Sequence, residues 1–515
     1  MGVPPYFWAM FIRQKKNKSG SVSVQIISKH SGKSLVKSTV GSSWSREGIE
    51  ILMHQARHEL NRIQGQSSLF TSQTDANIEG FLNTLSNSNI QVIGPELVFG
   101  KIYDAIGLNA IKEDLFRHLV ISRLAFPLSK LKTIDYLYRF QGVRLNINSI
   151  YRFLDKLNKE LKEQVQQITY QHTLGLLNNN ISIVFYDMTT LYFEASDEDD
   201  LRKTGFSKDG KHRNPQIYLG LLVTLGGYAI GYEVFEGNIF EGHTLIPFIE
   251  KMNKKCNLSK PVVVADAGLL SNANLQALEQ EHYEFILGAK IRTESADIKQ
   301  QILSAGLKDG EQLVIKKGNR SLIVAYRENR ALKDAYNRKR GLQRLEKQIK
   351  NGKLTKAQIN NKGYNKYLAM KGNVSIEIDY QKYEQDALWD GLKGYITNSK
   401  LNAKAVIENY KHLWHIERAF RMSKTDLRIR PIYHRLADRI EAHICVSFAA
   451  YAIYKDFERI LYKERSSLSV KKAAEQTQNM YQIVATLPES KKQTNVLLKM
   501  NEEQNQILKI IAKYY

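Results

Sequence analysis

Apolar and polar positions alternate along the first part of the chain. The stretches "GSVSVQIISKH" and "KSLVKSTVGSS" have period two and lie between Ser/Gly-rich turns, which predicts a small antiparallel sheet within residues 6–45. Ser45 then precedes a helical pattern in "SREGIEILMHQARHELNRIQ". A basic unit of this kind can grip DNA, and a solvated sheet face would show the same pattern.

A polar stretch at residues 65–78 predicts a linker, and helical periodicity then runs through residues 94–175. In the best example, Asn148 or Ser149 is the expected N-cap. The apolar residues that recur behind it at helical spacing are Ile150, Phe153, Leu154, Leu157, Leu161 and Val165. Such short amphipathic helices with scattered bases fit a helix-turn-helix DNA reader, and they equally fit a bundle without any DNA role.

From residue 181 the pattern becomes that of buried strands. The stretches "ISIVFYD" and "IYLGLLVTLGGYAIGYEVFEGN" predict three strands in hairpin succession, with a turn at Gly226 and Gly227 and a helical piece near 244–251. The segments "PVVVADAG" and "YEFILGAKI" predict two more strands, separated by a helix that Ser271 opens. Antiparallel strands followed by alternating helix and strand indicate an α/β layer with a mixed sheet.

Residues 292–388 do not continue this alternation. Their basic stretch at 327–353 has apolar residues one helical turn apart, which predicts an insertion with a charged face. We expect a single helix from about Ala403 to Lys424, followed by a largely helical C-terminal tail.

Composition narrows the choice of partners. Of 515 residues, 75 are Lys or Arg and 52 are Asp or Glu, so the formal net charge is +23. This excess attracts a phosphate backbone or an anionic membrane surface, and nucleic acid is the commoner partner. Two cysteines, Cys256 and Cys445, exclude a disulfide framework and a thiolate zinc site, and we expect both to be buried. The apolar segment 442–454 is too short to span a membrane and the start lacks signal-peptide order, so we expect a cytoplasmic protein.

Two apolar runs each deliver an aspartate at an expected strand end. Asp187 follows "ISIVFY", and Asp266 follows "PVVVA". Aspartate is common at strand ends and in turns, so each residue alone is weak evidence for a site. Two strands of one sheet that both end in Asp can hold the carboxylates side by side. Like charges at such a short distance favour a divalent metal between them.

The segment 408–434 supplies a third acid. We expect one helix face to be buried, the face that carries Leu413, Ile416, Phe420 and Leu427. A second face sets an acid among bases and an aromatic residue: Tyr410, Glu417, Arg421, Lys424 and Arg428. A metal site beside a phosphate backbone needs this combination, although a solvated face with i,i+4 ion pairs would look similar. Oxygen ligands without a Cys/His set favour Mg²⁺ or Mn²⁺ over zinc.

Six stretches of the chain carry a family resemblance: "YDMTTLYFE", "GFSKDGKHRNPQIYLGLLV", "GYEVFEGN", "VVADAGLLS", "DGLKGYITN" and "YKHLWHIERAFRMSK". Over about residues 180–455 the chain resembles bacterial insertion-sequence transposases of the IS-four superfamily, which have a ribonuclease H-like catalytic domain and a DDE triad. The family signature in the last stretch is Tyr, two residues, Arg, three residues, Glu, six residues, Lys. Tyr410, Glu417 and Lys424 match it, while Leu413 stands at the Arg position.

Pattern and resemblance together predict an α+β multidomain protein with a ribonuclease H-like mixed α/β catalytic core. We expect seven segments: a small basic β-rich unit (1–64), a linker (65–93), a helical region that can bind DNA ends (94–178), the first part of the core (179–291), an insertion (292–388), the second part of the core (389–455) and a helical tail (456–515). The long gap between Asp266 and Glu417 resembles the mostly β insertion of this superfamily.

The resemblance also implies a chemistry. Asp187, Asp266 and Glu417 are expected to hold two Mg²⁺ ions about 3.5–4 Å apart, with Mn²⁺ as a substitute, for cleavage at terminal inverted repeats and strand transfer. The expected phosphate contacts are Tyr410, Arg421, Lys424, Arg428 and, in the basic loop "SKDGKHRN", Lys208 and Arg213. Trp389 is expected either to stack on a flipped base or to be a core residue. Relatives act as dimers, so we expect a homodimer on double-stranded DNA, at transposon ends and target, in the bacterial cytoplasm and associated with the nucleoid.

Two other functions remain open at this point. A stand-alone metal-dependent nuclease of the same fold would need the three acids but not the 180 residues ahead of the core. A non-enzymatic DNA-binding protein derived from a transposase would have no need of a repulsive acid cluster. In every case we expect DNA binding to weaken steeply as the salt concentration rises. A protein with a net charge of +23 releases many counterions from DNA when it binds.

Overall fold

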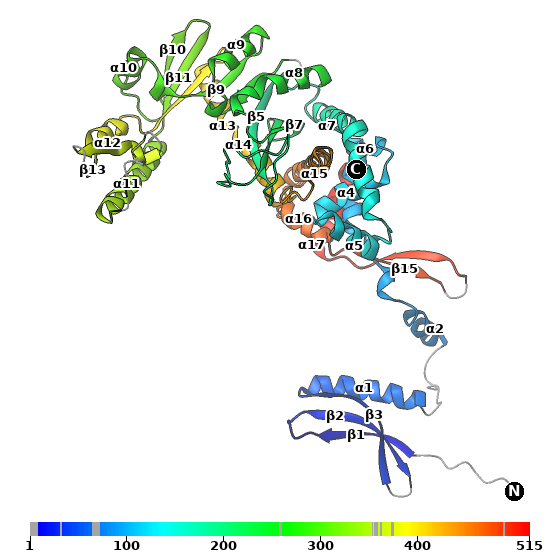
Figure 1. The fold of residues 1–515 in the computed structure, drawn as a ribbon. Helices are drawn as coiled ribbons and strands as arrows, with labels where there is room; N and C mark the ends of the chain where they lie inside the picture. The colour runs from blue at the N-terminus through cyan, green and yellow to red at the C-terminus, as the bar shows by residue number, and fades with distance from the viewer. Residues whose placement is uncertain are drawn as a thin grey trace, which may run out of the picture. The chain divides into compact units, whose positions relative to one another are not determined.

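The computed structural model describes residues 9–30, 33–63, 73–256, 260–352, 354, 359–360, 363–371, 375–487 and 490–515. The chain forms two compact units (Figure 1). One consists of residues 1–89 with 484–495, and the other of residues 90–483 with 496–515. All of the predicted site residues belong to the second unit.

The smaller unit contains the predicted antiparallel sheet. Strands β1 (Ala9–Lys16), β2 (Val22–His30) and β3 (Lys33–Ser43) pair in that order, and helix α1 (Arg46–Ile63) packs its apolar side on them. The predicted linker is partly wrong, because Gln73–Leu82 forms helix α2. Apolar side chains at helical spacing, at the end of an otherwise polar stretch, explain this short helix.

The larger unit begins with the predicted helical region. Its helices are α3 (Lys101–Ile106), α4 (Asp114–Ala125), α5 (Lys130–Gln141), α6 (Ile147–Lys156) and α7 (Lys162–Leu176), with π-helical turns at Glu96–Gly100 and Leu157–Leu161. The predicted cap of α6 is wrong: Asn146 is the N-cap and accepts a hydrogen bond from the Asn148 amide. The helix therefore starts before the apolar pattern does.

A mixed eight-stranded sheet forms the centre of this unit, in the order β10-β11-β14-β9-β8-β5-β6-β7. The strands β5 (Ile183–Tyr192), β6 (Gln216–Thr224) and β7 (Ala229–Glu236) are antiparallel neighbours. The strands β8 (Val262–Ala265) and β9 (Phe285–Ala289) run parallel to β5. Helices α8 (Leu245–Cys256) and α9 (Asn272–Gln280), the latter capped by Ser271 as predicted, connect them. Three antiparallel strands followed by two parallel ones are the core of a ribonuclease H-like fold.

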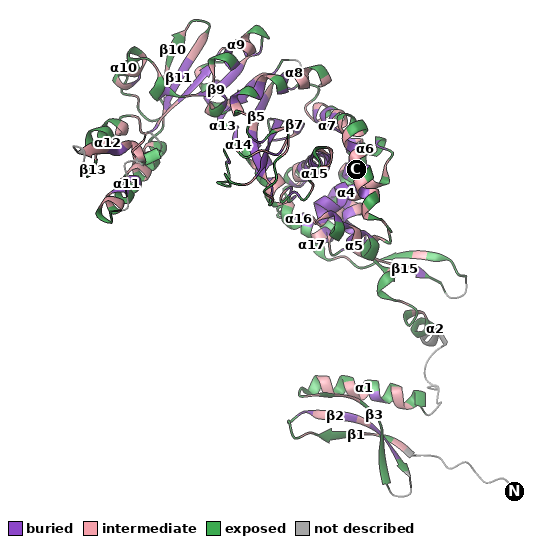
Figure 2. Ribbon diagram, viewed as in Figure 1, coloured by how far each residue is buried: buried purple, intermediate pink, exposed green. Residues whose placement is uncertain are grey.

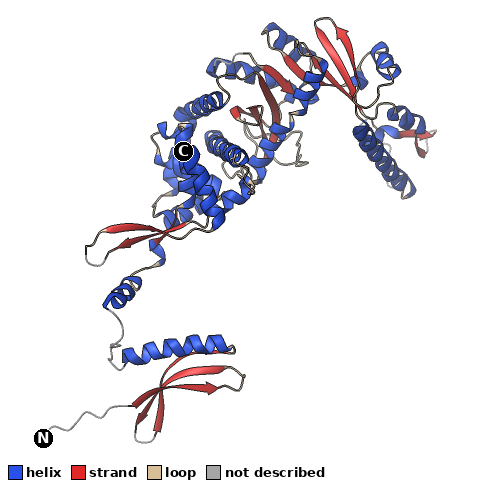
Figure 3. Ribbon diagram, turned by 180° about the vertical axis from the view of Figure 1, so that it is seen from behind, coloured by secondary structure: helices blue, strands red, loops and turns tan. Residues whose placement is uncertain are grey.

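Side chains of alternate residues on the strands enter two separate hydrophobic clusters. On β5, Phe185 joins the cluster that contains α13, α14 and α15, whereas Val184 and Tyr186 join the cluster that contains α8 and α9. The sheet is therefore covered by helices on both faces, as period-two alternation between two apolar layers requires. Figure 2 shows the buried positions concentrated on these strands and on α15, and Figure 3 shows the strands and the neighbouring helices from behind.

The insertion is partly an extension of the central sheet. Strands β10 (Gln312–Lys317) and β11 (Arg320–Tyr326) form a hairpin that pairs with β14 (Leu392–Thr397). The remainder contains the hairpin of β12 (Leu368–Lys371) and β13 (Ser375–Ile378) and the helices α10 (Ala296–Ser304), α11 (Glu328–Lys350) and α12 (Tyr380–Ala387). The basic helix was predicted correctly, but the expectation of a mostly β insertion is wrong, because α11 alone is 23 residues long.

The expected single helix over 403–424 is two helices, α13 (Ala403–Lys411) and α14 (Trp414–Thr425). The amides of His412 and Leu413 bond to carbonyls three residues earlier, so the backbone tightens and changes direction without any glycine or proline. The predicted buried face is correct, since Leu413, Ile416, Phe420 and Leu427 are all buried.

Helix α15 (Ala437–Lys463) runs through the core, and its segment 442–454 is buried throughout, as predicted. Cys445 lies there and is buried, while the side chain of Cys256 lies outside the described residues. Helices α16 (Val470–Thr477) and α17 (Glu502–Tyr514) and strands β15 (Tyr481–Thr486) and β16 (Gln493–Leu497) follow, and β15 pairs with β4 (Ile90–Val92). Among the described residues, no helix has the length and apolar character needed to cross a membrane.

Candidate active site

The register of β5 and β8 brings two aspartates together. The parallel pairing of these strands ends with Tyr186 opposite Ala265, and Asp187 and Asp266 are the next residues on each. Both follow residues that point to the α8–α9 face, so both side chains belong to the opposite face, where α13 and α14 pack. Asp187 is not at a strand end as predicted, because β5 continues to Tyr192 by pairing with β6 alone.

Helix α14 adds the third acid. Ile416 and Phe420 bury one side of the helix against the sheet, and this leaves Glu417, in the first turn, exposed. Asp187, Asp266 and Glu417 all line one cavity of about 330 Å³. The other residues that line it are Lys393, Tyr410, Lys411, Leu413 and Trp414. Three acids that are far apart in sequence therefore share one cavity.

Asp187 is held by a backbone amide and a lysine. Its Oδ1 accepts a hydrogen bond of 2.7 Å from the Met188 amide and lies 3.4 Å from Lys208 Nζ. Burial raises the pKa of Asp187 to about 6, and the nearby ammonium of Lys208 only partly offsets this effect. The carboxyl therefore has an environment in which extra positive charge would be strongly favourable.

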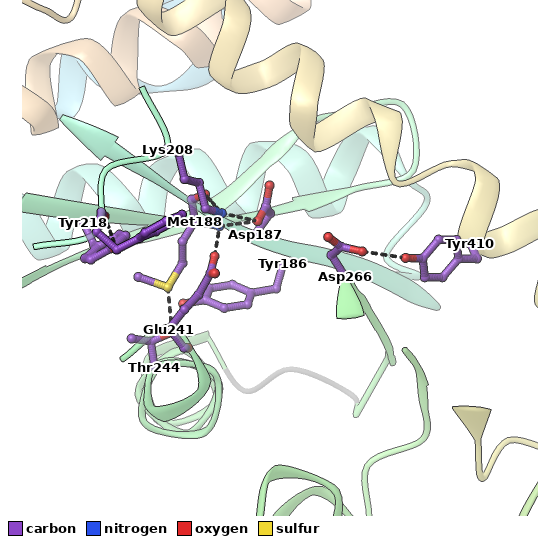
Figure 4. Close-up of polar contacts among 10 residues, drawn as sticks. Tyr186, Asp187, Met188, Lys208, Tyr218, Glu241, Thr244, Asp266 and Tyr410 are labelled. Atoms are coloured by element: carbon purple, nitrogen blue, oxygen red, sulfur yellow. Dashed lines mark hydrogen bonds and ion pairs between the residues drawn. The ribbon is translucent and has the colours of Figure 1, made fainter. Parts of the chain in front are cut away.

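A fourth acid, Glu241, shares this lysine. Lys208 Nζ donates to Glu241 Oε1 at 2.5 Å and to the Met188 carbonyl at 2.7 Å (Figure 4). Burial lowers the pKa of Lys208, but the charges of Asp187 and Glu241 outweigh that effect, so the pKa is raised. The predicted phosphate ligand Lys208 is thus an ion-pair partner of two acids. Glu241 was missed because it lies in a short 3₁₀ turn (Glu241–His243), with no apolar pattern to mark it.

Asp266 has a different partner. Tyr410 Oη donates a hydrogen bond of 2.9 Å to Asp266 Oδ1 (Figure 4). Burial, and then the charge of Asp266, raise the pKa of this tyrosine, so the phenol keeps its proton. Gly288 makes the contact possible, because a Cβ there would lie 2.6 Å from Tyr410 Oη. Tyr410 is therefore placed to orient a carboxylate rather than to lie free for phosphate.

Lys393 is a second residue that the sequence analysis missed. It is in β14, and its Nζ lies 4.4 Å from the centroid of the Tyr410 ring. Burial and the charge of Arg330 lower its pKa, against the raising effect of Asp266 and Glu417. Its stretch, "DGLKGYITN", carries the family resemblance, so that motif was the available signal.

The remaining predicted bases fall into two groups. Lys424 is largely buried and donates to Asp209 Oδ2 at 3.1 Å, which also binds Arg430 at 2.7 Å. Arg213, Arg421 and Arg428 are exposed. Arg428 was predicted to share a helix face with Glu417, but α14 ends at Thr425 and Arg428 has a positive φ of 46°.

Trp389 lies at a larger cavity beside the acids. This cavity is about 720 Å³ and is lined by Asp266 and Tyr410 on one side and by Arg330, Arg338 and Trp389 from the insertion and its end. Trp389 also packs against a small hydrophobic cluster that contains Leu322 and Val324. Trp389 therefore both lines a cavity and packs against a hydrophobic cluster, so the structure does not choose between a base platform and a packing residue.

The donor set suits a divalent metal. Carboxylate oxygens are the ligands that hard divalent cations prefer, and three line one cavity. In the described part of the chain, no three Asp, Glu, His or Cys side chains lie close enough together to hold one ion. Lys208 and Tyr410 engage the two aspartates instead.

Comparisons with known proteins support the family resemblance. The sequence model described as "Transposase DDE domain" matches residues 178–453, more than half of the chain. No curated protein sequence matches significantly. Among solved structures, a piggyBac transposase synaptic complex with hairpin DNA is 10% identical, with a TM-score of 0.39 over 75% of this chain and 76% of that chain. A Mos1 transposase paired-end complex with the left transposon end is 13% identical, with a TM-score of 0.16 over 31% of this chain and 53% of that chain.

The family assignment rests on the sequence match and not on these structural likenesses. The match contains the whole of the first part of the core, the insertion and both helices α13 and α14. The chain therefore belongs to the DDE transposases, a family of enzymes whose general activity is cleavage and transfer of DNA strands with divalent metal ions.

Proposed function

We propose that Asp187, Asp266 and Glu417 are the catalytic acids of this transposase and that they bind Mg²⁺, with Mn²⁺ as a substitute and two ions in each active site. The reaction is cleavage at the terminal inverted repeats of an insertion sequence, followed by strand transfer. One observation carries this proposal: acids from β5, from the end of β8 and from α14 line one cavity.

The residues around the acids have separate roles in this proposal. Tyr410 orients Asp266 through its hydroxyl, and Lys208 neutralises Asp187 and Glu241 in the protein without metal. When bound, the divalent ions supply activation of the attacking oxygen and stabilisation of the leaving oxygen. Burial raises the pKa of Asp187 to about 6, so a nearby cation would stabilise its ionised form.

DNA contacts come from bases that are free to reach a phosphate. Arg213, Arg421 and Arg428 are exposed and suit this role. Lys208 and Lys424 bind acids in the structure, so they act on DNA only by exchanging those partners. Trp389 suits a base platform because it lines the 720 Å³ cavity that also contains Asp266.

Double-stranded DNA, as transposon ends and as target, is the partner that the family activity and the net charge of +23 both support. A homodimer assembled on DNA and a nucleoid-associated place in the bacterial cytoplasm complete the proposal.

Strand cleavage on a labelled duplex that carries the flanking repeats tests the proposal. Wild type is compared with Asp187→Asn, Asp266→Asn, Glu417→Gln and the control Glu281→Gln, which changes an exposed glutamate at the end of α9. We expect cuts at the repeat boundary from wild type and the control, and none from the triad variants, which still bind DNA. Binding without cleavage by wild type would favour the non-enzymatic DNA-binding function, and cleavage unrelated to the repeats would favour the stand-alone nuclease.

A further inference from the structure

A second cavity of the larger unit, of about 520 Å³, lies apart from the three acids. It is formed by the start of α5, parts of α4, α6 and α15, and the segment after α14. Its basic lining residues are Arg123, Lys130, Lys132, Arg428, Arg430, His434 and His443. None of the described residues that line it is acidic. We call it the basic cavity.

One arginine and one lysine are buried in its wall. Arg123 is 6% exposed, and its Nη1 donates to the carbonyls of Leu427 at 3.5 Å and Arg428 at 3.2 Å. Lys130 is 9% exposed, and its side-chain ammonium has no hydrogen-bond or ion-pair partner among the residues that the structure describes. Burial lowers the pKa of Arg123 to about 10, and burial together with Arg123 lowers that of Lys130 well below its usual range. Within the described part of the chain, neither base has a carboxylate partner.

The N-terminus of α5 and the charge of Lys130 add positive potential to other residues of the cavity wall. Ser129 caps α5, a helix of 12 residues whose positive end begins at Lys130. His434 has its pKa lowered to about 4 by burial and then by Lys130, with Asp155 opposing. Asp155 itself is bound by Arg439 through both carboxylate oxygens, at 2.8 and 2.9 Å. A buried cation without a partner is costly, and an anion in the cavity would remove that cost.

We propose that the basic cavity binds a phosphate group, that of a DNA backbone. This inference rests on the proposed function, in which DNA lies beside Glu417. Arg428 and Arg430 follow α14 closely, and Arg430 shares the carboxylate of Asp209 with Lys424. The segment from Glu417 to Arg430 therefore joins the acid-lined cavity, which Glu417 lines, to the basic cavity, which Arg428 and Arg430 line. The volume of about 520 Å³ accommodates a phosphate with its sugar, against the apolar side chains of Leu131 and Tyr151.

DNA binding of the full-length protein in EDTA, measured over a series of salt concentrations, tests the inference. Lys130→Met keeps the apolar stem and removes the charge, Lys130→Arg restores it, and Lys101→Met is the control on an exposed lysine of α3. We expect Lys130→Met to weaken binding about tenfold. The slope of log affinity against log salt should also become shallower by about 1. Lys130→Arg should restore most of both effects, and the control should behave as wild type.

A second arm separates a DNA phosphate from a small one. The melting temperatures of wild type and Lys130→Met are compared in inorganic phosphate and in chloride at equal ionic strength. Stabilisation of wild type alone, with unchanged DNA binding by Lys130→Met, would assign the cavity to a small phosphate compound and overturn the DNA assignment. No effect in either arm would overturn the inference entirely. If Lys130→Met does not fold, Lys132→Gln, at an exposed position that lines the cavity, replaces it.

The two proposals fail in different ways. Loss of cleavage in the triad variants, with normal DNA binding by Lys130→Met and Lys132→Gln, would leave the proposed function standing and remove only the role of the basic cavity. Absence of any DNA binding by wild type would remove both.

Discussion

The acid-lined cavity and the basic cavity differ in the partners of their charged side chains. In the first, Asp187 and Glu241 share Lys208, and Asp266 takes a hydrogen bond from Tyr410. In the second, among the described residues, Arg123 has only backbone carbonyls as partners and the Lys130 ammonium has none. The aspartates therefore have internal partners, whereas Arg123 and Lys130 lack a counter-ion within the described chain. The difference predicts opposite ligands for the two cavities.

The largest expected effect is on the acid-lined cavity. Removal of divalent ions with EDTA should reduce strand cleavage by on the order of 10³-fold or more, because the metal contribution is worth several kcal/mol of transition-state stabilisation. Gel-based cleavage with added Mg²⁺ or Mn²⁺ should recover the activity, while DNA binding persists throughout. Cleavage that is unaffected by EDTA would contradict a metal role for these acids.

Substitution of Lys208 should show what offsets the repulsion between Asp187 and Glu241. Without the lysine, Asp187 and Glu241 repel each other, so Lys208→Met should lower the free energy of unfolding by about 2 kcal/mol in EDTA. Mg²⁺ should recover more stability in this variant than in wild type, because the cation replaces the lost charge. Urea denaturation with and without Mg²⁺ measures both. An equal response to Mg²⁺ in both proteins would show that Lys208 is not at the metal position.

The pH dependence of Asp187 sharpens the comparison further. Its pKa is raised from 3.8 to about 6 in the folded protein, so folding favours the protonated carboxyl. This contribution to stability is fully present below the ordinary pKa and is lost as the pH rises through about 6. Asp187→Asn should therefore match wild type near pH 4 in EDTA and exceed its stability by about 1–2 kcal/mol at pH 8. Denaturation curves over this range, with Glu281→Gln as control, test the difference; a constant offset at all pH values would contradict it.

The smallest effect is expected from the hydroxyl of Tyr410. Tyr410→Phe removes one hydrogen bond to Asp266 and keeps the ring, so we expect a stability change of about 1 kcal/mol or less. Cleavage should fall by about tenfold, which corresponds to one such interaction in the transition state. Tyr395→Phe is the matched control, because its ring packs against Tyr410 at 4.9 Å and is also buried. An equal loss of cleavage in both variants would assign the effect to packing and not to the hydrogen bond.

Much of the core was predictable because its signals are local. Apolar runs marked β5 and β8, and the buried positions Ile416 and Phe420 followed from helical spacing. The break between α13 and α14 was not predictable, because no glycine or proline marks it. The extension of the central sheet by strands of the insertion was also missed, since the pairing of β11 with β14 joins segments about seventy residues apart.

The residues of the candidate site also differ in whether a local sequence pattern marks them. Asp187, Asp266 and Glu417 could be predicted from the sequence because each follows a periodic apolar pattern and matches a family motif. Glu241, Lys393 and Asp209 were missed because they act through contacts between distant segments. The ion pair from Lys424 to Asp209, for example, spans 215 residues.

The amino-acid sequence by itself determined the types of element, the three acids and the strong positive charge of this transposase, because these depend on residue type and short-range spacing. Only the tertiary structure decided which acids are neutralised, which bases are free, and that Arg123 and Lys130 share a cavity without an acid. The physical reason is that pairing and desolvation of charges depend on distances across the fold, and those distances are set by long-range packing of the sheet and its helices.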